Sequence, residues 1–190
     1  IFAEGAHENT ENIDHIGTYR EFQTVDAISI FETLRRREPE LKIGVLTESV
    51  LILPSIPELQ GTMLRMGPLG NTGYVKVEFF GGMVEAMEMV KALFQEGKLQ
   101  VLIGNESLLE EDWEDNPINS LILPGCRNDF YLADRIRGMC LHRDTNNPDK
   151  TLNIWHLCSL LPADMVGDVG TYKTASADKM HRGYLESSDF

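Results

Sequence analysis

The chain has 190 residues, of which 42% are apolar and 25% are charged, as in ordinary globular proteins. Its 30 acidic and 17 basic residues give a net charge of −13, which argues against nonspecific binding of nucleic acid or anionic membranes by net charge alone. The longest apolar stretch, Ser49–Pro54, is far shorter than the ~20 residues of a membrane span. Three widely spaced cysteines do not form a disulfide framework, so we expect a cytoplasmic protein.

The first predicted helix follows a polar lead-in segment, residues 1–23, that has no clear hydrophobic period. From Thr24 on, apolar residues recur at every third position, as in an amphipathic helix. They are Val25, Ile28, Phe31 and Leu34. Arg35–Arg37 follow where the helix dipole favours cations, and Pro39 ends the helix.

Short segments rich in apolar and β-branched residues predict strands further along the chain. These segments are residues 42–47, 49–53, 74–80, 99–103, 119–123 and 151–157. The glycines of residues 67–73 predict a turn. Residues 83–96 and 129–141 predict helices, and Gly97 is expected to cap the first of these two. The apolar face of that helix consists of Val84, Met87, Val90 and Phe94.

Strands that alternate with helices are typical of βαβ units. The sequence therefore predicts an α/β fold, with a parallel sheet of five or more strands and helices on both faces. In such sheets the active positions lie beyond the carboxyl ends of the strands. We therefore expect any chemistry in the loops that follow Leu46, Ile103 and Leu123.

Two kinds of binding loop are absent from the sequence or incomplete. No GxxxxGKS/T loop occurs, and no GxGxxG follows a predicted strand, so the chain alone has no visible means of holding a nucleotide's phosphates. The acidic residues 104–117 resemble a calcium loop only in part, because Pro117 stands where such a loop needs glycine and Leu123 where it needs glutamate. We interpret this stretch as a solvated acidic turn.

Cysteines and histidines in the second half of the chain invite a zinc interpretation. They are Cys126, Cys140, His142, His156 and Cys158. Their C-x-H and H-x-C spacings differ from the usual zinc-ligand pairs, and buried cysteine is common in protein cores. We therefore expect no metal site, and a Cys–His nucleophile pair has no local support.

Three arginines, Arg135, Arg137 and Arg143, lie on or just after the last predicted helix, with His142 beside them. One interpretation is surface ion pairing with nearby acidic residues. The other is a set of cations that faces phosphate groups, since arginine is well suited to bidentate phosphate binding. The residues alone leave both interpretations open.

Residues 101–123, VLIGNESLLEEDWEDNPINSLIL, resemble motif V of superfamily 2 helicases of the bacterial DEAD/DEAH-box branch. Residues 132–157, which end in NNPDKTLNIWHL, resemble motif VI and the segment after it. Upstream, residues 30–36 and 42–47 are similar to the motif IV region. The resemblance is collinear from about Val25 to Leu157.

This resemblance implies the C-terminal RecA-like domain of a helicase, over residues 24–160, with residues 161–190 as a C-terminal extension. In that family the second domain closes over ATP and magnesium held by a first domain, which this chain lacks, and its motif VI arginines stabilise the transferring phosphoryl group. The implied phosphate-facing residues are Arg135, Arg137, Arg143 and His142. The implied nucleotide-binding residues are Glu111, Glu114 and Gly138. The implied nucleic-acid-binding residues are Thr47, Gly104, Asn105 and Ser107.

The sequence departs from the family pattern at working positions. Three glycines of the family are replaced by acids, namely Glu48, Glu110 and Asp112. In motif V, the threonine, the lysine and the aspartate are replaced by Asn105, Glu106 and Glu114. In motif VI, the glutamine and two arginines are replaced by Arg135, Met139 and His142. Arg137 and Gly138 match. Two functions follow as expectations. One is the second domain of a nucleic-acid-dependent ATPase, which is inactive alone and needs a first domain in cis or in trans. The other is a catalytically dead helicase-fold module with a structural or protein-interaction role.

Overall fold

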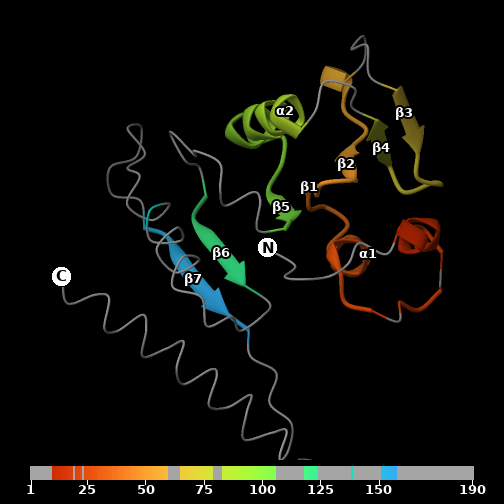
Figure 1. Ribbon diagram of the computed structural model, residues 1–190, viewed down its shortest axis with the longest axis horizontal. Helices are drawn as coiled ribbons and strands as arrows, with labels where there is room; N and C mark the ends of the chain where they lie inside the picture. The colour runs from red at the N-terminus through yellow and green to blue at the C-terminus, as the bar shows by residue number, and fades with distance from the viewer. Residues whose placement is uncertain are drawn as a thin grey trace, which may run out of the picture. The chain divides into compact units, whose positions relative to one another are not determined.

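The computed structural model describes residues 10–18, 20–22, 24–59, 65–78, 83–105, 118–123, 138 and 151–157. The chain divides into two units, residues 1–111 and residues 112–190. Figure 1 labels the helices and strands of both units. The helical elements are the 3-10 helices η1 (Thr10–His15) and η2 (Pro57–Leu59) and the α-helices α1 (Ala27–Arg37) and α2 (Met83–Gln95). The strands are β1 (Ile43–Leu46), β2 (Leu51–Pro54), β3 (Arg65–Pro68), β4 (Tyr74–Glu78), β5 (Val101–Gly104), β6 (Ser120–Leu123) and β7 (Asn153–His156).

Helix α1 begins at a capping box formed by Asp26 and Ser29. Asp26 caps its first turn by accepting a hydrogen bond from the Ser29 amide, and the Ser29 hydroxyl accepts one from the Asp26 amide in return. Val25 precedes this cap and is 78% exposed, so it lies outside the helix that we expected to start at Thr24. Ile28 and Phe31 are buried, as the predicted apolar face requires.

Helix α2 ends in a Schellman motif at the predicted glycine. Gly97 has a φ of 69°, its amide donates to the Phe94 carbonyl, and the Lys98 amide donates to the Leu93 carbonyl. Met87 and Val90 are buried as expected, but Val84 is 66% exposed and so does not belong to the buried face. The cap predicted at Gly97 is therefore confirmed, whereas the predicted apolar face is correct only in part.

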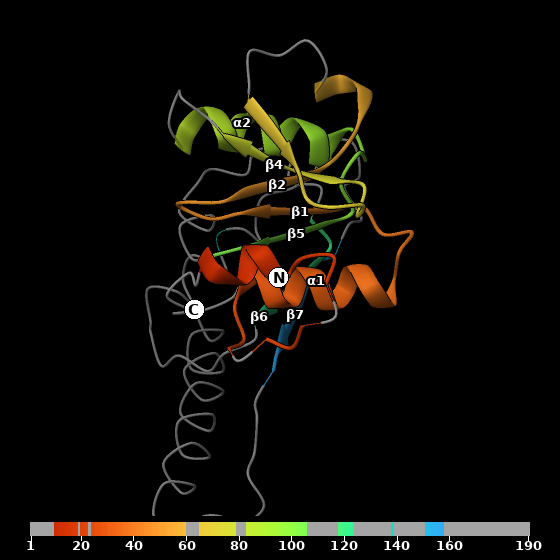
Figure 2. The ribbon, with the colours of Figure 1, turned by 90° about the vertical axis from the view of Figure 1, so that its right-hand side faces the viewer.

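The first unit contains a five-stranded sheet with the order β3-β4-β2-β1-β5. Helix α2 covers one face and α1 covers the other, with η1 beside α1 (Figure 2). The two central strands, β1 and β2, are buried along their whole length, as expected for strands covered on both faces. The core between α1 and the sheet includes Ile28, Phe31 and Ile103, and the Phe31 ring meets the Tyr74 ring edge-on at 5.0 Å.

The chain is a mixed α/β protein, as the sequence predicts, but only some of its strands pair in parallel. Strands β1 and β5 are parallel, whereas β1–β2, β2–β4 and β3–β4 are antiparallel. The reason is the length of the connections, because a parallel pair needs a crossover of about a dozen residues or more. Residues 47–50 are too few for a crossover from β1 to β2, while the segment from β1 to β5 is long enough and contains α2.

Strand β3 has no counterpart among the predicted strands. Its residues are all exposed, and the turn that we expected over residues 67–73 begins only after Pro68.

In the second unit, β6 and β7 form a parallel pair in which Ser120 lies opposite Asn153 and Leu123 lies opposite His156. Leu121 and Leu123 of β6 are buried, whereas Trp155 of β7 is 59% exposed.

Candidate functional site

Two predicted nucleic-acid-binding segments meet at one edge of the first sheet. Strands β1 and β5 run in parallel with Leu46 opposite Gly104, so their carboxyl ends lie at the same edge. Thr47 follows β1 directly, and Asn105 follows β5 directly. The structure therefore brings Thr47 together with Gly104 and Asn105, at the kind of edge where α/β sheets hold their sites. We call these three residues, together with Glu48, the β1/β5 edge.

The Thr47 side chain is committed to the turn between β1 and β2. Its amide donates to the Val50 carbonyl at 2.9 Å, and its Oγ1 accepts from the Val50 amide at 3.1 Å. The same hydroxyl lies 3.3 Å from the Val50 carbonyl, to which it donates. Only 2% of Thr47 is exposed. Thr47 therefore shapes this edge by closing the turn, and its hydroxyl points into the protein.

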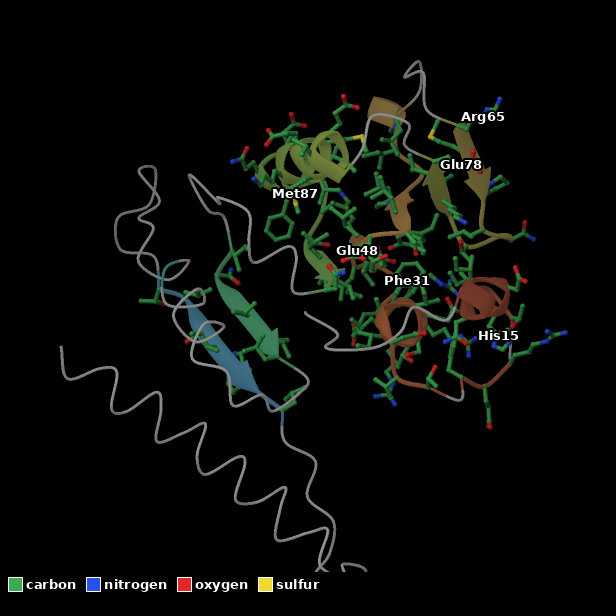
Figure 3. The ribbon with its side chains drawn as sticks, in the orientation of Figure 1. His15, Phe31, Glu48, Arg65, Glu78 and Met87 are labelled. Carbon is green, nitrogen blue, oxygen red and sulfur yellow. The ribbon has the colours of Figure 1, made fainter. Side chains whose placement is uncertain are left out.

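Glu48 is the exposed acidic side chain of the β1/β5 edge (labelled in Figure 3). It follows the buried Thr47 in the β1–β2 turn. A carboxylate at this position repels a phosphate group, because affinity for nucleic-acid backbones comes from neutralising their charge with cations. On the β5 side, Gly104 is buried and Asn105 is half-buried. The edge thus combines a closed turn, a glycine and an amide with one exposed acid.

The motif VI candidates lie mostly outside the described residues. Gly138 is described as helical and half-buried, and a Cβ atom placed on it would meet no heavy atom within 4 Å. Its surroundings among the described residues therefore do not demand glycine. The remaining predicted site residues of motifs V and VI lie outside the described part of the chain; they are Arg135, Arg137, His142, Arg143, Glu111, Glu114 and Ser107.

A buried ion cluster on α1 was not predicted from the sequence. The Glu32 carboxylate is fully buried, and Arg35 binds it through two nitrogens at 2.7 and 2.8 Å. Arg36 adds a third contact at 2.8 Å, and the Gly17 amide donates a fourth at 3.0 Å. The signal that could have revealed it is the spacing, because residues three and four positions apart share one helix face.

These contacts set the ionisation of the cluster. Burial by itself would raise the pKa of Glu32, but the hydrogen bonds from Arg35, Arg36 and Gly17 outweigh it and hold that pKa below 4.5. The hydrogen bond to Glu32 in turn raises the pKa of Arg35. Glu32 is therefore an ionised carboxylate with its partners in place. Its role is structural, because its hydrogen bonds come from two arginines of α1 and from the Gly17 amide of the same unit.

No metal site emerges in the described ranges, where no three His, Cys, Asp or Glu side chains come close enough to share an ion. Of the cysteines and histidines considered for zinc, Cys126, Cys140, His142 and Cys158 lie outside these ranges. The helices of the same described part include none with the length and apolar character needed to cross a membrane.

Comparisons with models of protein families, with curated proteins and with solved structures gave no match.

Proposed function

We propose that this chain is the second RecA-like domain of a superfamily 2 nucleic-acid-dependent ATPase, acting with a first domain supplied in cis or in trans. The observation that carries the proposal is the meeting of two motif-like segments at the β1/β5 edge. Residues 42–47 resemble the motif IV region and residues 101–105 begin the motif V resemblance. They are distant in sequence, yet their strands pair in parallel, residue for residue.

The strand pairing is compatible with a RecA-like sheet that carries an insertion. The two parallel pairs, β1–β5 and β6–β7, are formed by the segments that the resemblance assigns to that fold. The antiparallel strands β2, β3 and β4 lie between β1 and α2 in the chain. On this proposal, these three strands are an antiparallel insertion in the RecA-like sheet. ATP with magnesium would be held by the first domain, and Arg137 would reach its phosphate groups.

A second candidate is a helicase-fold module without catalysis, with a structural or protein-interaction role. Two observations at the β1/β5 edge favour it. The Thr47 hydroxyl donates its single proton within the β1–β2 turn, so that proton is not available to a phosphate oxygen. Glu48 adds an exposed negative charge at the same edge. Both features weaken the contact with a phosphate backbone that an active helicase domain requires.

Substitution at Asn105 tests whether this edge faces nucleic acid. With the first domain present, in cis or in trans, Asn105→Glu should weaken the binding of a labelled oligonucleotide about tenfold, because it adds a repelling charge beside the nucleic-acid backbone. Asn71→Glu is the matched control, since Asn71 is an exposed residue in the β3–β4 turn, at the opposite end of the sheet. Equal effects of the two substitutions, or no effect of the first, would count against the proposal.

A further inference from the structure

Residues 10–18, which we call the strap, lie along α1 and are tied to it by polar contacts (Figure 2). The Asn12 side chain donates to the Asp26 carboxylate at the start of α1. Near the other end of the strap, the Gly17 amide donates to Glu32 at 3.0 Å, and the Arg36 guanidinium donates to the Thr18 carbonyl. The strap is thus held at both ends to a single helix.

Glu32 controls two of these three ties. Its carboxylate accepts the Gly17 hydrogen bond directly. It also binds the Nε of Arg36 at 2.8 Å, which orients the guanidinium whose other nitrogen reaches Thr18. The groups that face Glu32 are Arg35 and Arg36 from α1 and the Gly17 amide from the strap. Hydrogen bonds to ionised groups are about twice as strong as neutral ones, so the Glu32 carboxylate anchors the Gly17 end of the strap, as the Asp26 carboxylate anchors the Asn12 end.

Among the described residues, the apolar attachment of the strap consists of two side chains, and the rest of the first unit has its own packing. Ile16 is buried in the cluster that contains Ile28, Phe31 and Tyr74, and Ile13 packs against that cluster while half-buried. Helix α1 contacts β1 and β5 independently of the strap. Elements with few buried contacts are the ones that open locally while the core stays folded.

Among the described residues, the strap has one buried polar side-chain atom without a hydrogen-bond partner. The Nδ1 of His15 is buried and has no hydrogen-bond partner among the described residues, while its ring lies 5.7 Å from the ring of Phe22. A buried polar atom without a partner costs free energy, which opening to water would recover. Within the described part of the chain, the contact of the strap with α1 is therefore disfavoured at His15 and favoured at Glu32.

We propose that the strap is a detachable latch, which opens as a unit when the Glu32 carboxylate no longer holds Gly17 and Arg36. Opening uncovers the part of the core cluster that Ile13 and Ile16 cover, while α1 and the sheet keep their packing. This inference does not depend on the proposed function, because it concerns contacts within the first unit alone.

Native-state hydrogen exchange of the full chain, resolved by peptide mass spectrometry, tests the latch. In Glu32→Gln, the amides of Ile16, Gly17 and Thr18 should exchange about tenfold faster or more, because the neutral amide replaces an ionised acceptor and offers one acceptor oxygen in place of two. Exchange in β1 and β5 should stay as in the unmodified chain. Glu88→Gln is the matched control, since Glu88 is an exposed carboxylate on α2 that lies 3.9 Å from the Lys91 ammonium and makes no part of the strap's attachment. It should leave the strap unchanged.

Two results would overturn the latch. One is an equal acceleration in the strap, β1 and β5, because Glu32 would then support the whole core. The other is unchanged strap exchange in Glu32→Gln. If that variant does not fold, Arg36→Ala serves in its place, since it removes the tie to Thr18 and one of the contacts to Glu32 at a side chain that is partly exposed. Faster exchange confined to the strap supports the latch, and unchanged or uniformly faster exchange refutes it.

Discussion

Tyr74→Phe tests how β4 holds the start of β1. The Tyr74 hydroxyl donates to the Leu41 carbonyl at 2.9 Å and accepts from the Ile43 amide at 3.3 Å. The substitution removes this one oxygen and keeps the aromatic ring, so the edge-on contact with Phe31 is preserved. It therefore isolates the two hydrogen bonds that join β4 to the chain at the entrance of β1.

The expected loss is about 1–2 kcal/mol in the free energy of unfolding. A net contribution of about 0.5–1.5 kcal/mol is typical for one hydrogen bond, and a buried group left without its partner costs about 1–3 kcal/mol. The longer, 3.3 Å bond contributes less than the 2.9 Å bond. The total is a sizeable part of the roughly 5–15 kcal/mol that stabilises a typical domain.

Urea unfolding at neutral and alkaline pH measures this effect. Burial raises the pKa of Tyr74 above its ordinary 10.0, so the unfolded chain loses the phenol proton first. The stabilising contribution is full below pH 10.0 and is lost as the pH rises toward the folded pKa. Tyr74→Phe should therefore be less stable than the unmodified chain at pH 7. Above pH 10, its free energy of unfolding should fall less steeply with pH than that of the unmodified chain.

Phe31→Leu separates the effect of the ring contact from that of the Tyr74 hydroxyl. That variant disturbs the ring contact but keeps the hydroxyl, so it should lose stability at pH 7 while keeping the alkaline decline of the unmodified chain. If Tyr74→Phe is as stable as the unmodified chain at pH 7, the hydroxyl does not hold β1. If both variants show the same alkaline decline, Tyr74 is not the group that titrates.

Further predictions concern acid, a helix end and nucleic acid. Because the pKa of Glu32 is held below 4.5, its stabilising contribution should be lost as the pH falls below 4.5 through the folded value, and acid titration of Glu32→Gln should show a shallower loss. Gly97→Ala should lower the free energy of unfolding by about 1 kcal/mol, since φ is 69° there and the site has open space; an unchanged urea midpoint would contradict this. The isolated chain should bind a labelled oligonucleotide no tighter than roughly 10⁻⁴ M at physiological salt, and micromolar, salt-sensitive binding in fluorescence anisotropy would contradict it.

Much of the fold could be predicted from local sequence patterns. The apolar spacing of Ile28 and Phe31 gave α1, and Gly97 marked the end of α2. Strand β3 could not be predicted, because Arg-Met-Gly-Pro has neither alternation nor β-branched residues. Its conformation is imposed by pairing with β4, in which Arg65 lies opposite Glu78 (Figure 3).

The candidate site shows the same division between local and tertiary information. The ends of β1 and β5 were expected to carry chemistry, and their parallel pairing puts Thr47 and Asn105 at one edge. The use of the Thr47 hydroxyl inside the turn could not be predicted, since it depends on the position of Val50 in the folded chain. The burial of Glu32 was missed because charged residues are rarely buried, even though Arg35 and Arg36 stand at the right spacing.

ATP hydrolysis tests the central claim most directly, namely that this chain completes a nucleic-acid-dependent ATPase. The chain together with its first domain, in cis or in trans, should release phosphate faster when nucleic acid is present, and Arg137→Ala should slow release about 10³-fold or more. Arg37→Ala, which changes an exposed arginine at the end of α1, should leave the rate unchanged. The 190-residue chain alone should release no phosphate above background. Two results would contradict the claim: hydrolysis by the chain alone that depends on Arg137, or nucleic-acid-stimulated hydrolysis by the chain with its first domain that Arg137→Ala does not slow.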